Sequence, residues 1–347
     1  MFAFRVETVI NRYAMKMKLQ LLLVVATSFL MTSCGENDGS IVMKVGIGVP
    51  ESHFEHKAMV MFKEHLAANS KIDVQIFPSN QLGADQEVLE SMRLGVAQMN
   101  LPDPAVLGNM VKEYNLLSFP FIFADQKVAN EVVDGPWGQD LLKKLEDIGY
   151  VGLGFGDFGF RHITNSVRPI EKIEDLKGLK IRTMQNPVHL DVFRTLGANP
   201  TPMAFSEVFS SLQQGLIDGQ ENPLKNIESN KLYEVQKHLT LDGHVYAFVV
   251  FVVAKPFYDK LSPADQATMQ DAARIAIAHM RESVQKEDAE ALKILKDAGL
   301  KVSELAEGEK KRMAEMVEQV KKKYADEINP KFYQSLKDEV AKAEKGE

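Results

Sequence analysis

The sequence contains very little cysteine. Cys34 is the only cysteine among 347 residues, which excludes a disulfide within the chain and a metal site built from cysteines. Basic residues are also in the minority, with 41 lysines and arginines against 48 aspartates and glutamates and a formal net charge of −7. Because proteins that bind nucleic acids present a basic face, this charge argues against a nucleic-acid partner. Any anion-binding site must then be local, made by a few arginines and backbone N–H groups.

The motifs of several enzyme classes are missing as well. The sequence has no serine nucleophile elbow, no zinc-binding helix and no phosphate-binding loop. His53 and His56 lie close together, but their spacing is not that of a zinc protease. Glu207 and Asp218 could be interpreted as a catalytic carboxylate pair, although Glu207, just inside a predicted helix start, is explained more simply as complementing the helix dipole. We therefore expect neither an enzyme nor a bound metal or other cofactor.

No apolar run in the sequence is long enough to cross a membrane. The longest, residues 19–31, has 13 residues, whereas a spanning helix needs about 20. Lys16 and Lys18 precede this run, and a basic segment followed by a short apolar core is typical of a secretory signal. We expect residues 1–33 to be this signal, with Met15 or Met17 as alternative translation starts. The protein is therefore predicted to act in the periplasm.

Small residues lead into Cys34 at the end of the predicted signal, as in a bacterial lipobox. Such a cysteine becomes the lipidated first residue, so we expect a lipid on Cys34, a short linker over 34–40 and membrane association through the lipid. The alternative is a soluble exported protein whose signal happens to contain a cysteine. Without residues 1–33 the chain has 41 − 4 = 37 basic and 48 − 1 = 47 acidic residues, a charge of about −10.

The region 156–223 gives the strongest indication of function. Arg161 and Arg182 lie at the edges of predicted strands, and Asn222 follows in a Gly-Gln-Glu-Asn-Pro sequence. A guanidinium group is a planar fork of donors that fits a carboxylate with two hydrogen bonds. A single arginine at a strand end is usually a surface charge. Two that flank one β-unit in an acidic chain favour the capture of a small anion.

An internal repeat predicts two similar lobes. Residues 86–95 reappear 120 positions later as residues 206–215, with Glu, Val, Ser and Gly in common and the apolar positions matched. Each copy is predicted to be a short helix that ends at a glycine, with a short strand before and after it. Because ligands of open α/β sheets bind beyond the carboxyl ends of the strands, 100–106 and 220–222 should face each other. The alternative is chance similarity between two amphipathic helices.

The remaining pattern predicts a two-lobed α/β protein. Strand, helix and strand alternate over 41–77. A glycine-rich strand at 150–156 suits a crossing between lobes, and 158–164 is predicted to be a second strand. Ser262 and the proline after it begin a helix with no breaker before Gly299, roughly 50 Å long. Such a helix could brace both lobes.

We expect the first lobe to contain residues 41–157 and 248–285. The second lobe should contain residues 158–247 and 286–347. The end of the chain, from Glu304, is predicted to form two charged surface helices separated by an Asn-Pro sequence.

Eight short motifs occur in a characteristic order along the chain. They are Gln81-Leu82-Gly83, Phe119-Pro120-Phe121-Ile122-Phe123, Gly159-Phe160-Arg161, Arg168-Pro169-Ile170, Asp175-Leu176-Lys177-Gly178-Leu179-Lys180-Ile181-Arg182, Leu196-Gly197-Ala198, Pro202-Met203-Ala204-Phe205-Ser206-Glu207-Val208 and Asp218-Gly219-Gln220-Glu221-Asn222-Pro223. The series resembles the substrate-binding subunits of tripartite ATP-independent periplasmic (TRAP) transporters, over residues 41 to about 340. The resemblance implies a two-lobed α/β fold like that of periplasmic binding proteins, with crossing strands and a long helix that join the lobes. The lobes would close on a carboxylate in the periplasm, and the protein would deliver it to the membrane permease.

The resemblance also implies roles for individual residues. Arg182 would grip the carboxylate with two hydrogen bonds, and Arg161 would assist. Asn222 would donate an amide hydrogen bond, and Phe205 would form an apolar wall. Four further positions lie on segments that face the rest of the ligand: His53, Asp85, Asn100 and Asp103.

The identity of the ligand is open at this point. His53, Asn100 and Asp103 offer polar partners for hydroxyl groups, which suits a sugar acid such as a uronate or an aldonate. The alternative is a C4-dicarboxylate, which would prefer a second cationic cluster that the sequence does not make evident. A binding protein for an ATP-driven importer and a receptor for a sensor system are further alternatives. In each case we expect a monomer that binds a small carboxylate.

Overall fold

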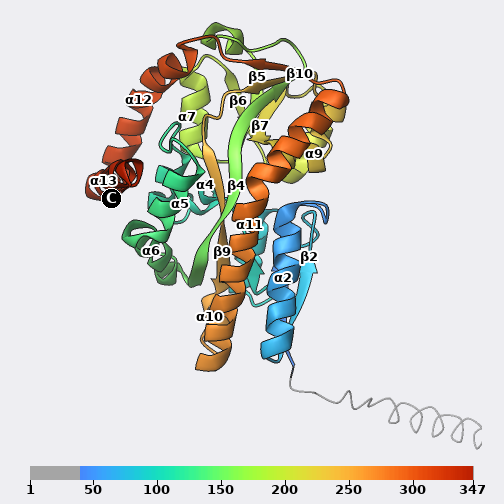
Figure 1. Cartoon of the computed structure of the whole chain (residues 1–347), viewed down its shortest axis with the longest axis vertical. Coiled ribbons are helices and arrows are strands. Elements are labelled where there is room, and N and C mark those ends of the chain that lie inside the picture. The colour runs from blue at the N-terminus through green and yellow to red at the C-terminus, as the bar shows by residue number, and fades with distance from the viewer. Residues whose placement is uncertain (1–39, 347) are drawn as a thin grey trace, which may run out of the picture. The chain divides into compact units, whose positions relative to one another are not determined.

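Ten strands form the frame of the molecule (Figure 1). The structure is a computed structural model that describes residues 40–346, so the predicted signal and Cys34 lie outside the described residues. The strands are β1 (Ile41–Gly46), β2 (Ile72–Phe77), β3 (Met99–Asn100), β4 (Tyr150–Asn165), β5 (Lys180–Thr183), β6 (Asn199–Pro202), β7 (Gly219–Pro223), β8 (His238–Leu241), β9 (Tyr246–Ala254) and β10 (Lys301–Glu304). Their order is β2-β1-β3-β9-β4-β7-β5-β6, and β8 pairs with both β4 and β10.

Strand β4 belongs to both halves of this arrangement. Its residues from Tyr150 to Phe160 pair with β9, and its residues from Arg161 to Asn165 pair with β7. The two strands predicted over 150–164 are therefore one continuous strand with two register shifts, one of them at Gly159. Gly159 has a φ of 104°, a left-handed conformation that suits glycine. The change of partner places Arg161 at the point where the two halves meet.

The internal repeat corresponds to two copies of one structural unit. In the first copy β1 lies between β2 and β3 and is parallel to both, and helix α3 (Asp85–Arg93) connects β2 to β3. In the second copy β5 likewise lies between β6 and β7 and is parallel to both, and helix α8 (Val208–Gln213) lies between β6 and β7 in the sequence. Each helix is followed by a glycine of positive φ, 74° at Gly95 and 69° at Gly215. The predicted repeat, with a glycine at each helix end, is thus present in the fold.

Helices cover the sheet and connect its strands. The longer ones are α2 (Phe54–Asn69), α5 (Gln126–Asp134), α6 (Pro136–Lys143), α7 (Pro187–Thr195), α11 (Pro263–Asp297), α12 (Glu309–Ile328) and α13 (Pro330–Lys345). Short helical turns are α4 (Pro104–Leu107), η2 (Lys112–Ser118), η3 (Glu146–Ile148), η4 (Ile173–Leu176), η5 (Phe205–Glu207), α9 (Leu224–Ser229), η6 (Leu232–Glu234) and α10 (Lys255–Tyr258). Among residues 40–346, none of the helices is both apolar enough and long enough to cross a membrane.

Helix α11 confirms the prediction of one long helix that braces both halves. Its N-cap is Ser262, whose hydroxyl accepts a hydrogen bond from the backbone of Asp265. Figure 1 shows α11 passing α2 near its beginning and α9 near its end, and the helix contacts both. Met280 belongs to the apolar cluster under α2, whereas Ala291 and Leu295 belong to the cluster under α9.

The C-terminal helices α12 and α13 are more than a charged surface layer. Helix α12 packs against α7, and α13 packs against α5 and α6 in the half predicted as the first lobe (Figure 1). Met313 and Leu336 are buried in the largest apolar cluster. The indole of Trp137 stacks on Phe332, with ring centroids 5.0 Å apart, and donates a hydrogen bond to its carbonyl oxygen. An apolar stripe on each helix explains this packing, because it gains free energy only by burial.

Candidate functional site

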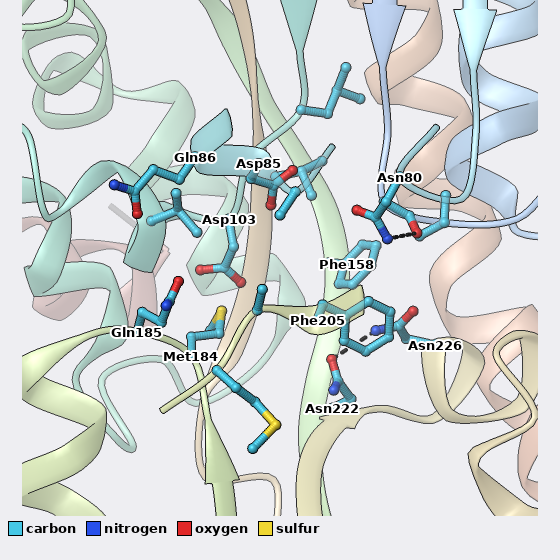
Figure 2. Close-up of a pocket in the computed structure, with 18 of the residues that line it drawn as sticks. Asn80, Asp85, Gln86, Asp103, Phe158, Met184, Gln185, Phe205, Asn222 and Asn226 are labelled. Carbon is cyan, nitrogen blue, oxygen red and sulfur yellow. Dashed lines mark hydrogen bonds between the residues drawn. The ribbon is translucent and has the colours of Figure 1, made fainter. Parts of the chain in front are cut away.

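A pocket lies where the two copies of the repeated unit face each other (Figure 2). About 850 Å³ inside it is free of protein atoms, including the part that opens to solvent. Its lining residues come from both copies and from the crossing strands: Gly48, Val49, Glu55, Asn80, Ala84, Asp85, Gln86, Leu101, Asp103, Val106, Asn109, Phe158, Arg161, Arg182, Met184, Gln185, Met203, Ala204, Phe205, Asn222, Asn226 and Val249. The position matches the expectation that a ligand binds beyond the carboxyl ends of the strands.

Arg182 is a buried cation on β5 that forms no ion pair in the described part of the chain. Its side chain is 2% exposed, and its Nε and Nη2 donate to the carbonyl oxygen of Met203 at 3.1 and 2.9 Å. The ring of Phe205 lies 5.7 Å from its Cζ. Burial lowers the pKa of Arg182 to about 10, so the group is still charged at neutral pH. A desolvated charge of this kind is costly until an anion pairs with it.

Arg161, by contrast, already has a carboxylate partner. Its guanidinium donates to both carboxyl oxygens of Glu221 and to the carbonyl oxygen of the same residue. Its Nη1 lies 3.6 Å from Oδ2 of Asp103, and its Nη2 lies 3.3 Å from Oδ1 of Asn222. The charge of Arg161 and a hydrogen bond from His244 hold the pKa of Glu221 well below its usual range, although burial opposes them.

This ion pair continues into a buried chain of alternating charges. His244 lies 3.2 Å from Glu221 through Nε2 and 2.7 Å from Asp242 through Nδ1. The two carboxylates raise the pKa of His244 to about 9 against the effect of burial, and His244 lowers the pKa of Asp242 to about 2. All three side chains are at most 4% exposed. The chain fixes the position of Arg161 at the pocket wall, and Arg182 is left as the cation available to a ligand.

In Figure 2 Asn222 and Phe205 lie on one side of the pocket, and Asp85 and Asp103 lie across from them. Arg182 lines the pocket from β5, in the same copy of the unit as Phe205 and Asn222. The amide of Asn222 donates to Gln220, and its oxygen accepts from Asn226, so this predicted donor is part of a local network. Burial and the charge of Asp103 raise the pKa of Asp85 to about 7. Burial also raises the pKa of Asp103, although Arg161 opposes that shift.

Two of the eight predicted residues, His53 and Asn100, are fully buried and do not line the pocket. His53 is the N-cap of α2, where its Nδ1 accepts a hydrogen bond from the backbone N–H of Glu55. Its ring lies 5.1 Å from that of Phe158, which does line the pocket. Asn100 donates to the carbonyl oxygen of Asp85 and supports that segment from behind.

Several lining residues were not singled out from the sequence. Glu55 is the clearest case, since its acidic side chain is 2% exposed and lines the pocket. The only signal was its place one residue inside a helix start, which is a common position for surface acids. Glu221 was part of a recognised motif, but its pairing with Arg161 depends on the antiparallel register of β4 and β7. No group of three or more potential metal ligands occurs within residues 40–346.

The geometry can be compared with known proteins. The family model for bacterial extracellular solute-binding protein, family 7, matches residues 45–327. The chain belongs to this family. These are the solute-binding proteins of TRAP transporters, so the resemblance seen in the sequence and the two-lobed α/β fold are both confirmed. The family is one of solute receptors and not of enzymes.

Three similar proteins show the range of this TRAP family. A solute-binding protein of Verminephrobacter eiseniae is 41% identical over 262 residues, which is 75% of this chain and 78% of the relative. The C4-dicarboxylate-binding periplasmic protein DctP of Rhodobacter capsulatus is 37% identical, over 78% and 81% of the two chains. The crystal structure of the sugar acid binding protein DctPAm from Advenella mimigardefordensis, in complex with galactonate, has a TM-score of 0.86 and 36% identity, over 88% of this chain and 99% of that one.

Proposed function

We propose that this TRAP solute-binding protein captures a sugar acid, a uronate or an aldonate, with its carboxylate on Arg182, and delivers it to the membrane permease. The observation that carries the proposal is the buried guanidinium of Arg182, which lines the pocket and whose only hydrogen-bond acceptor among the described residues is one carbonyl oxygen. A ligand carboxylate would add charge-assisted hydrogen bonds in a site shielded from water, where such bonds are strong. Ligand would therefore stabilise the state in which both lobes contact it.

The opposite wall of the pocket favours a hydroxylated ligand. It carries the carboxyl groups of Glu55, Asp85 and Asp103, together with the amides of Asn80 and Gln86. Such groups can accept hydrogen bonds from ligand hydroxyls or donate hydrogen bonds to them. A buried polar group without a hydrogen-bond partner costs roughly 1–3 kcal/mol. The galactonate complex of the Advenella protein supports this choice.

A C4-dicarboxylate is the second candidate, because the Rhodobacter relative is a C4-dicarboxylate-binding protein. A second carboxylate of the ligand would have to lie near the three acids opposite Arg182. Repulsion between like charges in a desolvated site disfavours that arrangement. The sugar acid is therefore the better match to this pocket.

Substitution of Arg182 tests the proposed function. Arg182→Ala should abolish binding of sugar acids measured by calorimetry, and Arg182→Lys should retain little, because lysine lacks the planar fork. Arg194→Ala is the matched control, since Arg194 is exposed and pairs with Asp191 on the outer surface. Sugar-acid affinity equal to that of the wild type in Arg182→Ala would contradict the assignment of the carboxylate site.

The lipid on Cys34 is a separate proposal that rests on the sequence around the cysteine alone. The comparisons support a periplasmic solute-binding protein and give no support to the anchor. Mass spectrometry of the protein purified from its host tests the proposal. A diacylglyceryl group on an amino-terminal Cys34 is the expected result, and an unmodified amino terminus after residue 34 would refute it.

A further inference from the structure

Glu55 is an acidic residue at the pocket whose carboxyl group has no partner among residues 40–346. It lies in the first turn of α2, is 2% exposed and lines the pocket. Its carboxyl group forms neither a hydrogen bond nor an ion pair with any other residue in 40–346, whereas its backbone N–H donates to Nδ1 of His53. An ionisable side chain that is buried without a partner destabilises a fold. Such a residue calls for an explanation outside the protein's own packing.

A role in the fold alone does not account for Glu55. Acidic residues in the first turn of a helix do interact favourably with its dipole, typically by 0.3–1 kcal/mol on an exposed surface. That gain requires the charged form, whereas burial and the charge of Asp85 raise the pKa of Glu55 well above its usual value. The helix already has a side-chain cap in His53. The interaction that offsets the burial of Glu55 must come from something else in the pocket.

The acids of the pocket form a series that leads away from the arginines. Asp103 is next to Arg161, with 3.6 Å between Nη1 and Oδ2. Burial and the charge of Asp103 raise the pKa of Asp85, and burial and the charge of Asp85 raise the pKa of Glu55. Glu55 lies on α2, which follows β1 of the first copy, whereas Arg182 lies on β5 of the second copy, so the two residues line the pocket from different halves of the molecule.

We propose that Glu55 binds a terminal hydroxyl of the ligand, at the end opposite the carboxylate, and selects hydroxylated chains over chains that end in a second carboxylate. This inference rests on the proposed function of Arg182. A neutral carboxyl group donates one hydrogen bond and accepts others, so it can pair with a hydroxyl in both directions. An ionised ligand carboxylate at the same place can accept the one hydrogen bond that Glu55 donates but has no hydrogen to donate in return, and it is repelled by the charge of Asp103 on the same wall. Glu55 thus selects a hydroxyl at one end of the ligand, and Arg182 selects a carboxylate at the other end.

Four proteins test the role of Glu55: the wild type, Glu55→Leu, Glu55→Gln and, as a control, Glu64→Gln on the exposed face of the same helix. Calorimetry with galactonate, galacturonate and glucuronate identifies the sugar acid that the wild type binds most tightly, and the variants are compared on that ligand and on succinate. Glu55→Leu should weaken the sugar acid about tenfold or more, because the ligand hydroxyl loses its partner. Glu55→Gln keeps a donor and an acceptor and should stay within about threefold of the wild type.

The stability of the ligand-free variants separates a binding role from a structural one. Removal of a buried, unpartnered carboxyl should leave the melting temperature of Glu55→Leu unchanged or higher, and succinate affinity should not fall. A lower melting temperature with unchanged sugar-acid affinity would show that Glu55 serves only the helix. Equal losses for the sugar acid and succinate, or no binding of any of the three sugar acids by the wild type, would also overturn the inference.

Two safeguards keep the test decisive. If Glu55→Leu does not fold, Glu55→Met removes the carboxyl with a more flexible side chain of similar size. Failure of this inference is distinguishable from failure of the proposed function. Loss of binding in Arg182→Ala with an unaffected Glu55→Leu removes only the role of Glu55, whereas normal binding in Arg182→Ala removes the carboxylate site itself.

Discussion

The two copies of the repeated unit share a backbone arrangement and differ in the chemistry that they present to the pocket. In the first copy β1 lies between β2 and β3, and the acids Asp85 and Asp103 begin or precede the helices after β2 and β3. In the second copy β5 lies between β6 and β7, and carries Arg182 itself. A duplicated frame thus positions both walls, and the residues at the strand ends make one wall acidic and the other cationic.

The two walls also differ in whether their ionisable groups are paired within the protein. On the second side, Arg161 is paired with Glu221 and held in a buried chain of charges, so one of two arginines is satisfied within the protein. On the first side, Glu55 and Asp85 have raised pKa values because burial outweighs any favourable partner. Fixed ion pairs build one wall, and the other consists of acids that gain from a neutral hydrogen-bonding ligand.

The largest effect should follow from breaking the ion pair of the cationic wall. Glu221→Ala leaves the guanidinium of Arg161 buried without its main partner, which costs about 3–5 kcal/mol of unfolding free energy. Urea denaturation of the ligand-free protein measures the loss. Glu207→Ala, which replaces an exposed acid at the end of η5, should stay within about 0.5 kcal/mol of the wild type. A small effect for Glu221→Ala would mean that the cationic wall does not depend on internal pairing.

A second effect concerns the pH dependence of the same wall. The pKa of His244 is raised from its ordinary value to about 9 by Asp242 and Glu221, so its stabilising effect is complete below about pH 6.5. It is lost as the pH rises through 9, by about 3 kcal/mol in total. Urea denaturation at pH 7 and pH 10 should show this fall in the wild type. His244→Gln should lose stability at pH 7 and show a flatter pH profile, and an equal slope in both proteins would refute the assignment.

The smallest effect tests whether the two frames are equivalent. Gly95 and Gly215 both end the repeated helix with positive φ, and a Cβ at either position would meet nothing within 4 Å. Alanine at each should therefore cost only the left-handed backbone conformation, about 1 kcal/mol. The two costs should be equal, and they should add in the double variant because the two Cβ atoms share no neighbour within 4 Å. Thermal or urea unfolding of the three variants checks this, and a marked inequality would break the structural analogy.

Local patterns in the sequence predicted much of the fold. The cap at Ser262, the uninterrupted helix after it and the repeated helix that ends in glycine are determined by short stretches of sequence. The single strand β4 was predicted as two, because glycines at 152–159 suggest a break, whereas neighbouring strands accommodate them as register shifts.

The candidate site was predictable to a smaller degree. Arg182 stood out because it and Arg161 flank one β-unit in an acidic chain and because both fall in motifs typical of the TRAP family. Other features of the site depend on contacts between segments that are far apart in the sequence. They are the burial of Glu55, the pairing of Arg161 with Glu221, and the positions of His53 and Asn100 behind the pocket wall. The separation of roles between the two arginines likewise becomes visible only when the chain is folded.

Because the two halves share β4, the chain cannot be divided into two stable fragments between them. Although the two halves repeat one arrangement of strands and helices, they cannot be separated as independent domains, because β4 is an inner strand of both. A cut at Phe160–Arg161 would put the first part of β4 in the N-terminal fragment and its partner β9, together with β7, in the C-terminal fragment, so that β4 and β9 would both have unpaired backbone edges. Fragments of this kind should recombine with each other or aggregate, and neither should persist as an independent module.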